Sequence, residues 1–315
     1  MSATPSAASL HIVIAGAGPA AQALVRRLTG GSDSRQRPFE GTITVLSNRD
    51  DCPDALLELA ELPQVSVRFG QPASFIDSGA KIVTTVDGME FSYDQLVIAT
   101  GSAPSLPPVV GAESGLSYST IDDAAAIGEA VKDLTKLVGR RPLGILVGNG
   151  PAAGQAEAVL RARGVRPVRT TLRPAAVVAA SGVAASGVAA SGVAASGVAA
   201  SGVAEETASN LPATGILFED GSSMKGDLVV LAEERTARNE LAGSAGLLVA
   251  SDGGISVGRD LATSVPGIWA IGDAASCDGL RLGLLLSAES SAMLCASGML
   301  LGLRGTEDQQ VPMAA

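Results

Sequence analysis

Cysteine and histidine, which often carry redox and metal chemistry, are scarce in this sequence of 315 residues. Cys52, Cys277 and Cys295 are widely separated and form neither a CxxC pair nor a metal-ligand pattern. Free thiols without a disulfide framework are typical of a reducing cytoplasm, which is the compartment we expect. The single histidine, His11, opens an apolar run, and we interpret it as structural. We therefore expect no metal site.

The sequence also lacks an excess of positive charge and a long uninterrupted apolar segment. Its formal net charge is −10 at pH 7, which argues against nucleic acid or an anionic membrane as the main partner. The first nine residues contain no basic region, so we expect no signal peptide. The apolar stretch 280–303 is interrupted by Arg281, Glu289 and several serines, which predicts a packed helix and not a membrane span.

What the sequence does contain is a strand–glycine–helix pattern near its beginning. Ile12–Ile14 is apolar, as in a buried strand, and apolar residues recur at helical spacing up to Leu28. Between them lies a G-x-G-x-x-A turn made of Gly16, Ala17, Gly18, Pro19, Ala20 and Ala21. In a dinucleotide fingerprint the first glycine permits the turn, the second admits a pyrophosphate and the last small residue brings the helix close. The alternative is a tight turn without a ligand.

A second copy of this pattern follows in the middle of the chain. Leu143–Val147 predicts a strand, Gly148, Asn149, Gly150, Pro151, Ala152 and Ala153 form the turn, and a helix is expected up to Arg163. Thr42–Leu46 and Val165–Leu172 are the matching second strands, so both units should be βαβ with parallel sheets. A chance glycine turn rarely recurs in the same context, and we therefore predict two dinucleotide sites.

The residues at the end of each second strand bear on ribose recognition, because an acid there often binds the ribose hydroxyls. Ser47 holds that place in the first unit. Asp50 is a weaker candidate, and a solvated loop is the alternative for it. The second unit has Arg169 and Arg173 and no acid, which favours a 2′-phosphate. Exposed arginines beside a loop are the alternative there.

Several shorter elements complete the prediction. Strands are expected at 65–68, 81–86, 96–99 and 267–271, and helices at 119–131 and about 284–301. Asp87-Gly88 predicts one hairpin, and a second is expected between Gly215–Phe218 and Asp227–Leu231. Gly272 and Asp273 follow the last strand, where a carboxylate suits a hydroxyl-binding site or caps the next helix.

Residues 178–202 are five copies of VAASG, a low-complexity repeat. Its period of five matches neither a helix nor a strand, so no face stays apolar. We expect a marginal helix or a loop within the second domain and assign the repeat no function.

Four motifs resemble, in order, those of the FAD- and NAD(P)-dependent pyridine nucleotide-disulfide oxidoreductases: Gly16–Ala21, Tyr93–Gly101, Gly148–Ala153 and Thr263–Asp273. Without a redox cysteine pair, the chain is most similar to the flavin portion of assimilatory nitrite and nitrate reductases and to ferredoxin or rubredoxin reductases. The resemblance implies an α/β fold with two doubly wound, Rossmann-like three-layer domains. The NAD(P) domain, 116–239, would contain the repeat and be inserted into the FAD domain, 1–115 and 240–315.

The same resemblance implies roles for individual residues. Gly16, Gly18 and Ala21 would hold the FAD pyrophosphate, Thr100 and Gly101 would close over the FAD, and Asp273 would bind its ribityl chain or a hydroxyl on the pyrophosphate side. Gly148, Gly150 and Ala153 would hold NAD(P)H. Because the flavin carries the chemistry, no catalytic acid or base is expected from the chain.

The function that this resemblance implies is electron transfer from NAD(P)H through FAD to a redox protein, such as a nitrite or nitrate reductase component or a ferredoxin. A homodimer remains open. The alternative is a regulatory or degenerate flavoprotein without turnover. It is favoured by Glu233 and Glu234, which replace an Arg-Pro-Asn-like run, by Gln155 in place of a glutamate, and by the short segment Asp51–Pro63.

Overall fold

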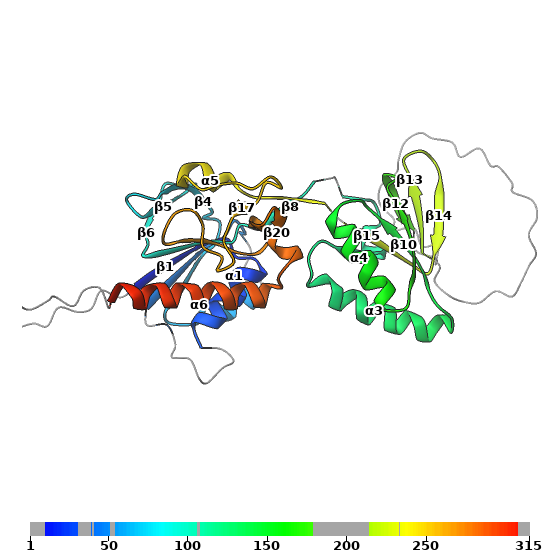
Figure 1. Ribbon diagram of the computed structural model, residues 1–315, viewed down its shortest axis with the longest axis horizontal. Helices are drawn as coiled ribbons and strands as arrows, with labels where there is room; N and C mark the ends of the chain where they lie inside the picture. Colours follow the sequence, from blue (N-terminus) through cyan, green and yellow to red (C-terminus); the bar gives the residue numbers. More distant parts are fainter. Residues whose placement is uncertain are drawn as a thin grey trace, which may run out of the picture. The chain divides into compact units, whose positions relative to one another are not determined.

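The computed structural model describes residues 10–30, 39, 41–50, 54–105, 108–178, 214–232 and 234–307, with side chains up to Leu300. The chain forms two compact units (Figure 1). Unit 1 comprises residues 1–106, 119–122 and 234–315, and unit 2 comprises residues 107–118 and 123–233. Unit 2 is therefore an insertion within unit 1.

A five-stranded parallel sheet forms the centre of unit 1, in the order β18-β7-β1-β2-β3. Its strands are β1 (Leu10–Ala15), β2 (Gly41–Leu46), β3 (Val65–Arg68), β7 (Gln95–Ile98) and β18 (Ile268–Ala270). Most central residues of β1, β2, β7 and β18 are apolar and buried, with Thr44 of β2 as a buried polar exception, and such runs are typical of parallel strands covered on both faces. The His11 ring hydrogen-bonds Thr44 Oγ1 on the neighbouring strand at 2.8 Å, consistent with a structural role.

Two different layers cover this sheet (Figure 1). Helices α1 (Pro19–Leu28) and α6 (Ala288–Glu307) pack together on one face. The other face carries an antiparallel sheet of β4 (Ala73–Asp77), β5 (Ile82–Thr85) and β6 (Glu90–Ser92), with α5 (Glu240–Ala245) packed against β4. The third layer is thus a sheet and not a second set of helices.

Smaller elements of unit 1 lie in its connections. Strands β8 (Ser102–Pro104) and β16 (Arg235–Ala237) pair antiparallel, so the segments before and after unit 2 run side by side. The remaining elements are α2 (Asp54–Ala60), β17 (Ile255–Ser256), β19 (Ala275–Cys277), β20 (Leu280–Arg281), and the short 3₁₀ turns η2 (Gly272–Ala274) and η3 (Leu282–Leu284).

Unit 2 repeats the three-layer plan around a four-stranded parallel sheet in the order β11-β10-β15-β9. These strands are β9 (Leu116–Tyr118), β10 (Leu143–Val147), β11 (Arg166–Thr170) and β15 (Leu228–Ala232). Helix α4 (Pro151–Ala162) contacts β10, β11 and β15, and α3 (Asp123–Val138) packs against α4. The outer sheet consists of β12 (Pro174–Val178), β13 (Thr214–Phe218) and β14 (Ser223–Gly226), and the short turn η1 (Ala112–Ser114) lies against β12.

Strand alternation explains the core of unit 2. Ile145 and Val229 point to the outer sheet, where they pack with Val177, Ile216 and Phe218. Leu146 and Val230 follow them in the chain, are equally buried, and point to the opposite face.

The structure corrects two predictions of local structure. The hairpin expected around the turn Glu219-Asp220-Gly221 forms, but its second strand is β14 and not Asp227–Leu231, because β15 runs parallel to β10. All five residues of β15 are buried, which suits the centre of a parallel sheet. The helix expected from Ser119 begins at Asp123, and residues 119–122 belong to unit 1. The Asp87-Gly88 hairpin is confirmed by the pairing of β5 with β6.

The VAASG repeat begins at Val178, the last residue of β12. Its remaining residues, and with them the expected helix or loop, lie outside the described residues. Val178 pairs with Gly215, so residues 179–213 connect two neighbouring antiparallel strands. In the part of the chain that the structure describes, no helix has the length and apolar character needed to span a membrane.

Candidate functional site

The first glycine turn lies at the carboxyl ends of the unit 1 strands. The Gly16 N–H donates to the Leu46 carbonyl at 2.8 Å, at the end of β2. Gly16 has φ +115°, and a Cβ at this position would lie 2.2 Å from the Ala99 carbonyl oxygen, just after β7. Only glycine tolerates both the conformation and the close approach. The turn therefore joins the ends of three neighbouring strands.

Gly18 has a different environment two residues later. It is the N-cap of α1, no side chain caps this helix, and Pro19 is its first residue. A Cβ on Gly18 would meet nothing within 4 Å. The first-turn amides, including those of Ala20 and Ala21, are therefore not occupied by a capping side chain. An uncapped helix N-terminus beside open space fits the pyrophosphate of a dinucleotide.

Thr100 and Gly101 connect this edge to the segment that returns from unit 2. The Thr100 hydroxyl donates to the Arg238 carbonyl at 2.7 Å, and the Arg238 N–H donates to the Gly101 carbonyl at 2.9 Å. Gly101 has φ +72°, and the position of its absent Cβ is open. Two crossing segments are thus held together beside the first glycine turn.

Asp273 belongs to a buried charged cluster that the sequence analysis did not predict. The Ser102 hydroxyl donates to Asp273 Oδ2 at 2.7 Å and accepts from Arg235 Nε at 2.7 Å. Arg281 Nε lies 3.3 Å from Asp273 Oδ1, and the two side chains are 9% and 12% exposed. This pair lacks hydrogen-bond geometry, so within the described part of the chain Oδ1 and Nε are buried without a hydrogen-bond partner. Oδ1 is therefore the carboxylate oxygen that receives no hydrogen bond from the described residues.

The cluster is close to the first glycine turn. Gly272 has φ +63°, and a Cβ there would lie 3.0 Å from the Ala20 methyl group. The η2 turn with Asp273 consequently packs against the first turn of α1. The structure thereby brings Gly16, Gly18, Ala20, Gly272 and Asp273 to one edge of the unit 1 sheet.

The second glycine turn has the same character. Gly148 has φ +137°, and a Cβ there would lie 2.7 Å from the Ala232 carbonyl at the end of β15. Gly150 is the N-cap of α4, with φ +75° and no side-chain cap. Ala153 is buried, and its methyl group would lie 3.5 Å from a Cβ on Gly148. This turn therefore also places an uncapped helix N-terminus at the carboxyl edge of a parallel sheet.

Arg169 is the predicted phosphate ligand that reaches this turn. Its Nε donates to the Gly148 carbonyl at 3.1 Å, and its Nη1 lies 3.7 Å from Glu157 Oε2. Arg173 is exposed after β11, and within the described residues its side chain has no ion-pair partner. The structure places Arg169, and not Arg173, against the glycine turn.

Asp50 lies in an exposed loop. Its Oδ1 would be 2.8 Å from a Cβ on Gly70, in the turn after β3. Ser47 is fully buried at the end of β2, and its hydroxyl accepts from the Arg49 N–H at 3.1 Å. The Ser47 hydroxyl is thus bonded within its own loop.

Gln155 is engaged by a buried tyrosine. The Tyr118 hydroxyl donates to Gln155 Oε1 at 3.2 Å, which joins the end of β9 to α4. Burial, with a smaller effect of Asp123, raises the pKa of Tyr118, so this tyrosine remains a neutral donor at physiological pH.

The cysteines of the described chain are both free. Cys277 is partly buried in β19 and Cys295 is fully buried in α6. Burial raises the pKa of the Cys295 thiol, which suppresses the reactive thiolate. Cys52 lies outside the described residues.

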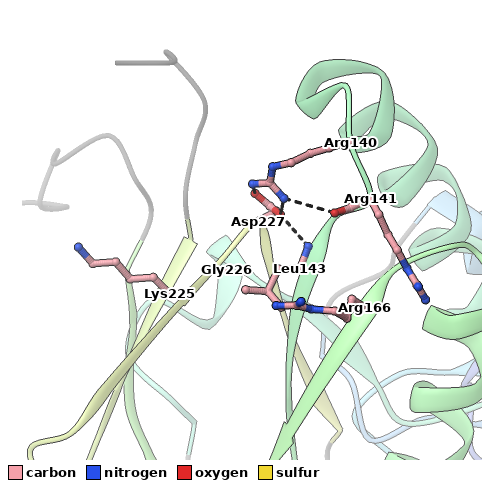
Figure 2. A pocket seen from close by; sticks show the side chains of 7 residues that line it. All are labelled: Arg140, Arg141, Leu143, Arg166, Lys225, Gly226 and Asp227. Carbon is pink, nitrogen blue, oxygen red and sulfur yellow. Dashed lines mark hydrogen bonds and ion pairs between the residues drawn. The ribbon is translucent and has the colours of Figure 1, made fainter. Parts of the chain in front are cut away.

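A basic pocket of about 490 Å³ lies at the opposite edge of the unit 2 sheet (Figure 2). It is lined by Arg140, Arg141, Leu143, Arg166, Lys225, Gly226 and Asp227. Arg140 donates to both oxygens of Asp227 at 2.9 and 2.8 Å, and the Leu143 N–H donates to Asp227 at 2.6 Å. Leu143 and Arg166 begin β10 and β11, so the pocket is at the amino ends of strands whose carboxyl ends carry the glycine turn.

Comparison with known proteins agrees with this geometry. The sequence pattern described as "Pyridine nucleotide-disulphide oxidoreductase" matches residues 10–295. The chain belongs to this family. Family members are oxidoreductases that use FAD with NAD(P)H, and the family resemblance seen in the sequence is confirmed.

Two curated relatives come from nitrogen metabolism. The chain is 32% identical over 225 residues to the nitrite reductase [NAD(P)H] large subunit of Klebsiella oxytoca, covering 70% of this chain and 23% of that protein. It is 30% identical over 240 residues to the assimilatory nitrate reductase electron transfer subunit of Bacillus subtilis, covering 70% and 28%. The chain thus spans about a quarter of the length of these relatives.

Among solved structures, an NAD-dependent persulfide reductase from A. fulgidus is 20% identical, with a TM-score of 0.49. The match covers 94% of this chain and 59% of that one.

Proposed function

We propose that unit 1 binds FAD, that unit 2 binds NAD(P)H, and that the protein passes electrons from NAD(P)H to a separate redox protein. The observation that carries this proposal is the duplicated site. Each unit has a glycine turn and an uncapped helix N-terminus at the carboxyl edge of its parallel sheet. FAD, when bound, supplies the chemistry that accepts a hydride and releases electrons.

In unit 1, Gly16 and Ala21 would bring the strand and helix together, and Gly18 with Pro19 and Ala20 would present the helix amides to the FAD pyrophosphate. The Oδ1 atom of Asp273 would accept from a ribityl hydroxyl, since it is buried without a hydrogen bond. Gly101 and Thr100 would close over the cofactor, and Gly272 would let η2 approach α1. For Asp50 a ribose contact is a weaker part of the proposal.

In unit 2, Gly148, Gly150 and Ala153 would hold the pyrophosphate of NAD(P)H in the same way. Arg169 would bind a 2′-phosphate, because its guanidinium is already fixed at the turn and can form charge-assisted hydrogen bonds. Arg173 is the second candidate for this phosphate. We therefore propose NADPH as the preferred donor.

The acceptor would be a metal-containing electron carrier, for example a nitrite or nitrate reductase component or a ferredoxin. Support comes from the relative named as an electron transfer subunit of assimilatory nitrate reductase. The burial of Cys295, which forms no short redox motif with Cys277, also favours direct transfer over thiol exchange, because exchange needs an accessible thiolate beside a second cysteine.

The experiment is to purify the protein, denature it and identify the released cofactor. The proposal expects a yellow protein that releases FAD without a covalent link, and a colourless protein that cannot be reconstituted with FAD contradicts it. NAD(P)H-dependent reduction of an artificial acceptor then separates the enzyme from the alternative, a dinucleotide-binding protein without turnover. The Tyr118–Gln155 hydrogen bond favours that alternative, because it occupies the side chain that replaces a glutamate of the family.

A further inference from the structure

The cluster around Asp273 combines two cations with one carboxylate in a largely buried place. Arg281 is 9% exposed and lies 3.3 Å from Oδ1, and Arg235 is 23% exposed and lies 3.9 Å from Oδ2. Gly283 lets the carboxylate pack closely, since a Cβ there would lie 1.9 Å from Oδ1. Removing one partner of such a buried pair leaves an uncompensated charge, so these side chains depend on one another.

The same arginine is bonded to the segments through which the chain enters and leaves unit 2. Arg281 Nη2 donates to the Ser119 carbonyl at 2.5 Å, and Nη1 donates to the Arg235 carbonyl at 3.4 Å. Ser119 belongs to residues 119–122, a short segment of unit 1 that lies between two stretches of unit 2 in the sequence. Arg235 is the second residue of the last unit 1 segment, which begins at residue 234. Ser102 lies in β8, shortly before residue 106, where the first segment of unit 1 ends.

Further contacts attach the segment 119–122 to the same part of unit 1. The Ile121 N–H donates to the Gly283 carbonyl at 2.8 Å, and the Ala288 N–H donates to Asp122 Oδ2 at 3.0 Å. The connecting segments and the Asp273 carboxylate therefore share one set of partners, all within unit 1.

We infer that Arg281 is a positioning residue of the FAD site: it orients the Asp273 carboxylate and ties it to the connecting segments of unit 1. The inference rests on the proposed function, because Asp273 must face bound FAD. FAD affinity then depends on a cation at position 281, and not only on the volume of its side chain. The dependence should act through Asp273, since Arg281 Nη1 and Nη2 are occupied by main-chain carbonyls.

The test is a double-mutant cycle in FAD affinity. The apo-protein is titrated with FAD, and the dissociation constant and the absorbance spectrum of bound flavin are measured for the wild type, Arg281→Met, Asp273→Asn and the double variant. Arg281→Met should weaken binding about tenfold or more and shift the spectrum, and Arg281→Lys should recover part of both. In the Asp273→Asn background, Arg281→Met should raise the FAD dissociation constant by less than about threefold, because the two side chains act as one unit. Asparagine is used because it keeps the size of the side chain and an oxygen that can accept a hydrogen bond, and removes only the negative charge.

Arg259→Met is the matched control, since this arginine is exposed in unit 1 and outside the cluster, and it should bind FAD as the wild type does. Equal affinity of Arg281→Met and wild type overturns the inference, and so does an equal loss with and without Asp273→Asn. If Arg281→Met does not fold, Arg281→Lys and the double variant decide: partly weakened FAD binding and a partly shifted spectrum in Arg281→Lys support it, and tighter binding by the double variant than by Asp273→Asn contradicts it. A wild type that binds no FAD refutes the proposed function itself.

Discussion

At the scale of single residues, the two glycines of the first turn meet opposite requirements. Gly16 is demanded by the fold, because a Cβ would enter the Ala99 carbonyl at positive φ. Gly18 has φ −72° and open space around it, so the fold itself accepts a side chain there. A ligand that approaches the backbone is the physical reason for a glycine at the second position.

Substituting the two glycines separates these requirements. Gly16→Ala should lower the free energy of unfolding by about 2 kcal/mol or more, because strain and a steric clash add. Gly18→Ala should leave the unfolding transition nearly unchanged and weaken FAD binding by about tenfold, as one close backbone–phosphate contact is lost. Urea denaturation and FAD titration of both variants measure this. A Gly18→Ala variant that unfolds as early as Gly16→Ala would show that the fold also needs the second glycine.

Cysteine reactivity is a second property set by single residues. Burial raises the pKa of Cys295, so its thiol stays protonated and inaccessible as the pH rises from 7 to about 9. Cys277 is only partly buried. Iodoacetamide should therefore label Cys277 well before Cys295 in the folded protein, and peptide mass spectrometry measures the order. Labelling in urea is the control, since both thiols should then react at equal rates. Equal labelling rates of Cys277 and Cys295 in the folded protein as well would contradict the burial argument.

At the scale of elements, local patterns predict well and distant pairings do not. The strand–glycine–helix units are confirmed, because strand burial, turn and helix spacing lie within about twenty consecutive residues. The partner of β13 was predicted wrongly, because β14 (Ser223–Gly226) is short and largely polar and gives no apolar strand signal, whereas the apolar β15 follows it in the sequence. The charged cluster was missed because its members are far apart in the sequence: Ser102 and Asp273, for example, are separated by 171 positions. The available signal was Arg281 itself, a charge inside an apolar stretch.

The VAASG repeat allows a prediction about the connection of β12 to β13. Deleting four of its five copies, residues 183–202, shortens this connection from 35 to 15 residues while both strands stay intact. Loop-closure entropy then favours the folded state by roughly 0.7 kcal/mol. Urea denaturation should show an unchanged or slightly higher stability of the deletion variant. A loss of more than about 1 kcal/mol would mean that the repeat contributes packing.

At the scale of the whole molecule, two parallel sheets each present a glycine turn at the carboxyl edge. The second turn differs from the first in having an arginine, Arg169, bonded to it. Arg169→Gln should lower the ratio of kcat/KM for NADPH over NADH about tenfold, because a charge-assisted bond to the 2′-phosphate is lost. Arg166→Gln is the control, since it changes the same strand at its opposite end. Steady-state kinetics with both nucleotides measure the ratio. An unchanged ratio in Arg169→Gln would remove Arg169 from nucleotide selection.

The central claim is that electrons pass from NAD(P)H to FAD and onward without a protein thiol. It is tested most directly by anaerobic titration of the FAD-loaded Cys52→Ser, Cys277→Ser, Cys295→Ser variant with NADPH, followed by a ferredoxin-type acceptor. We predict that flavin absorbance is lost on adding NADPH and returns when the acceptor is added, as in the wild type. A variant that folds and binds FAD, yet no longer transfers electrons, would contradict the account and point to thiol chemistry.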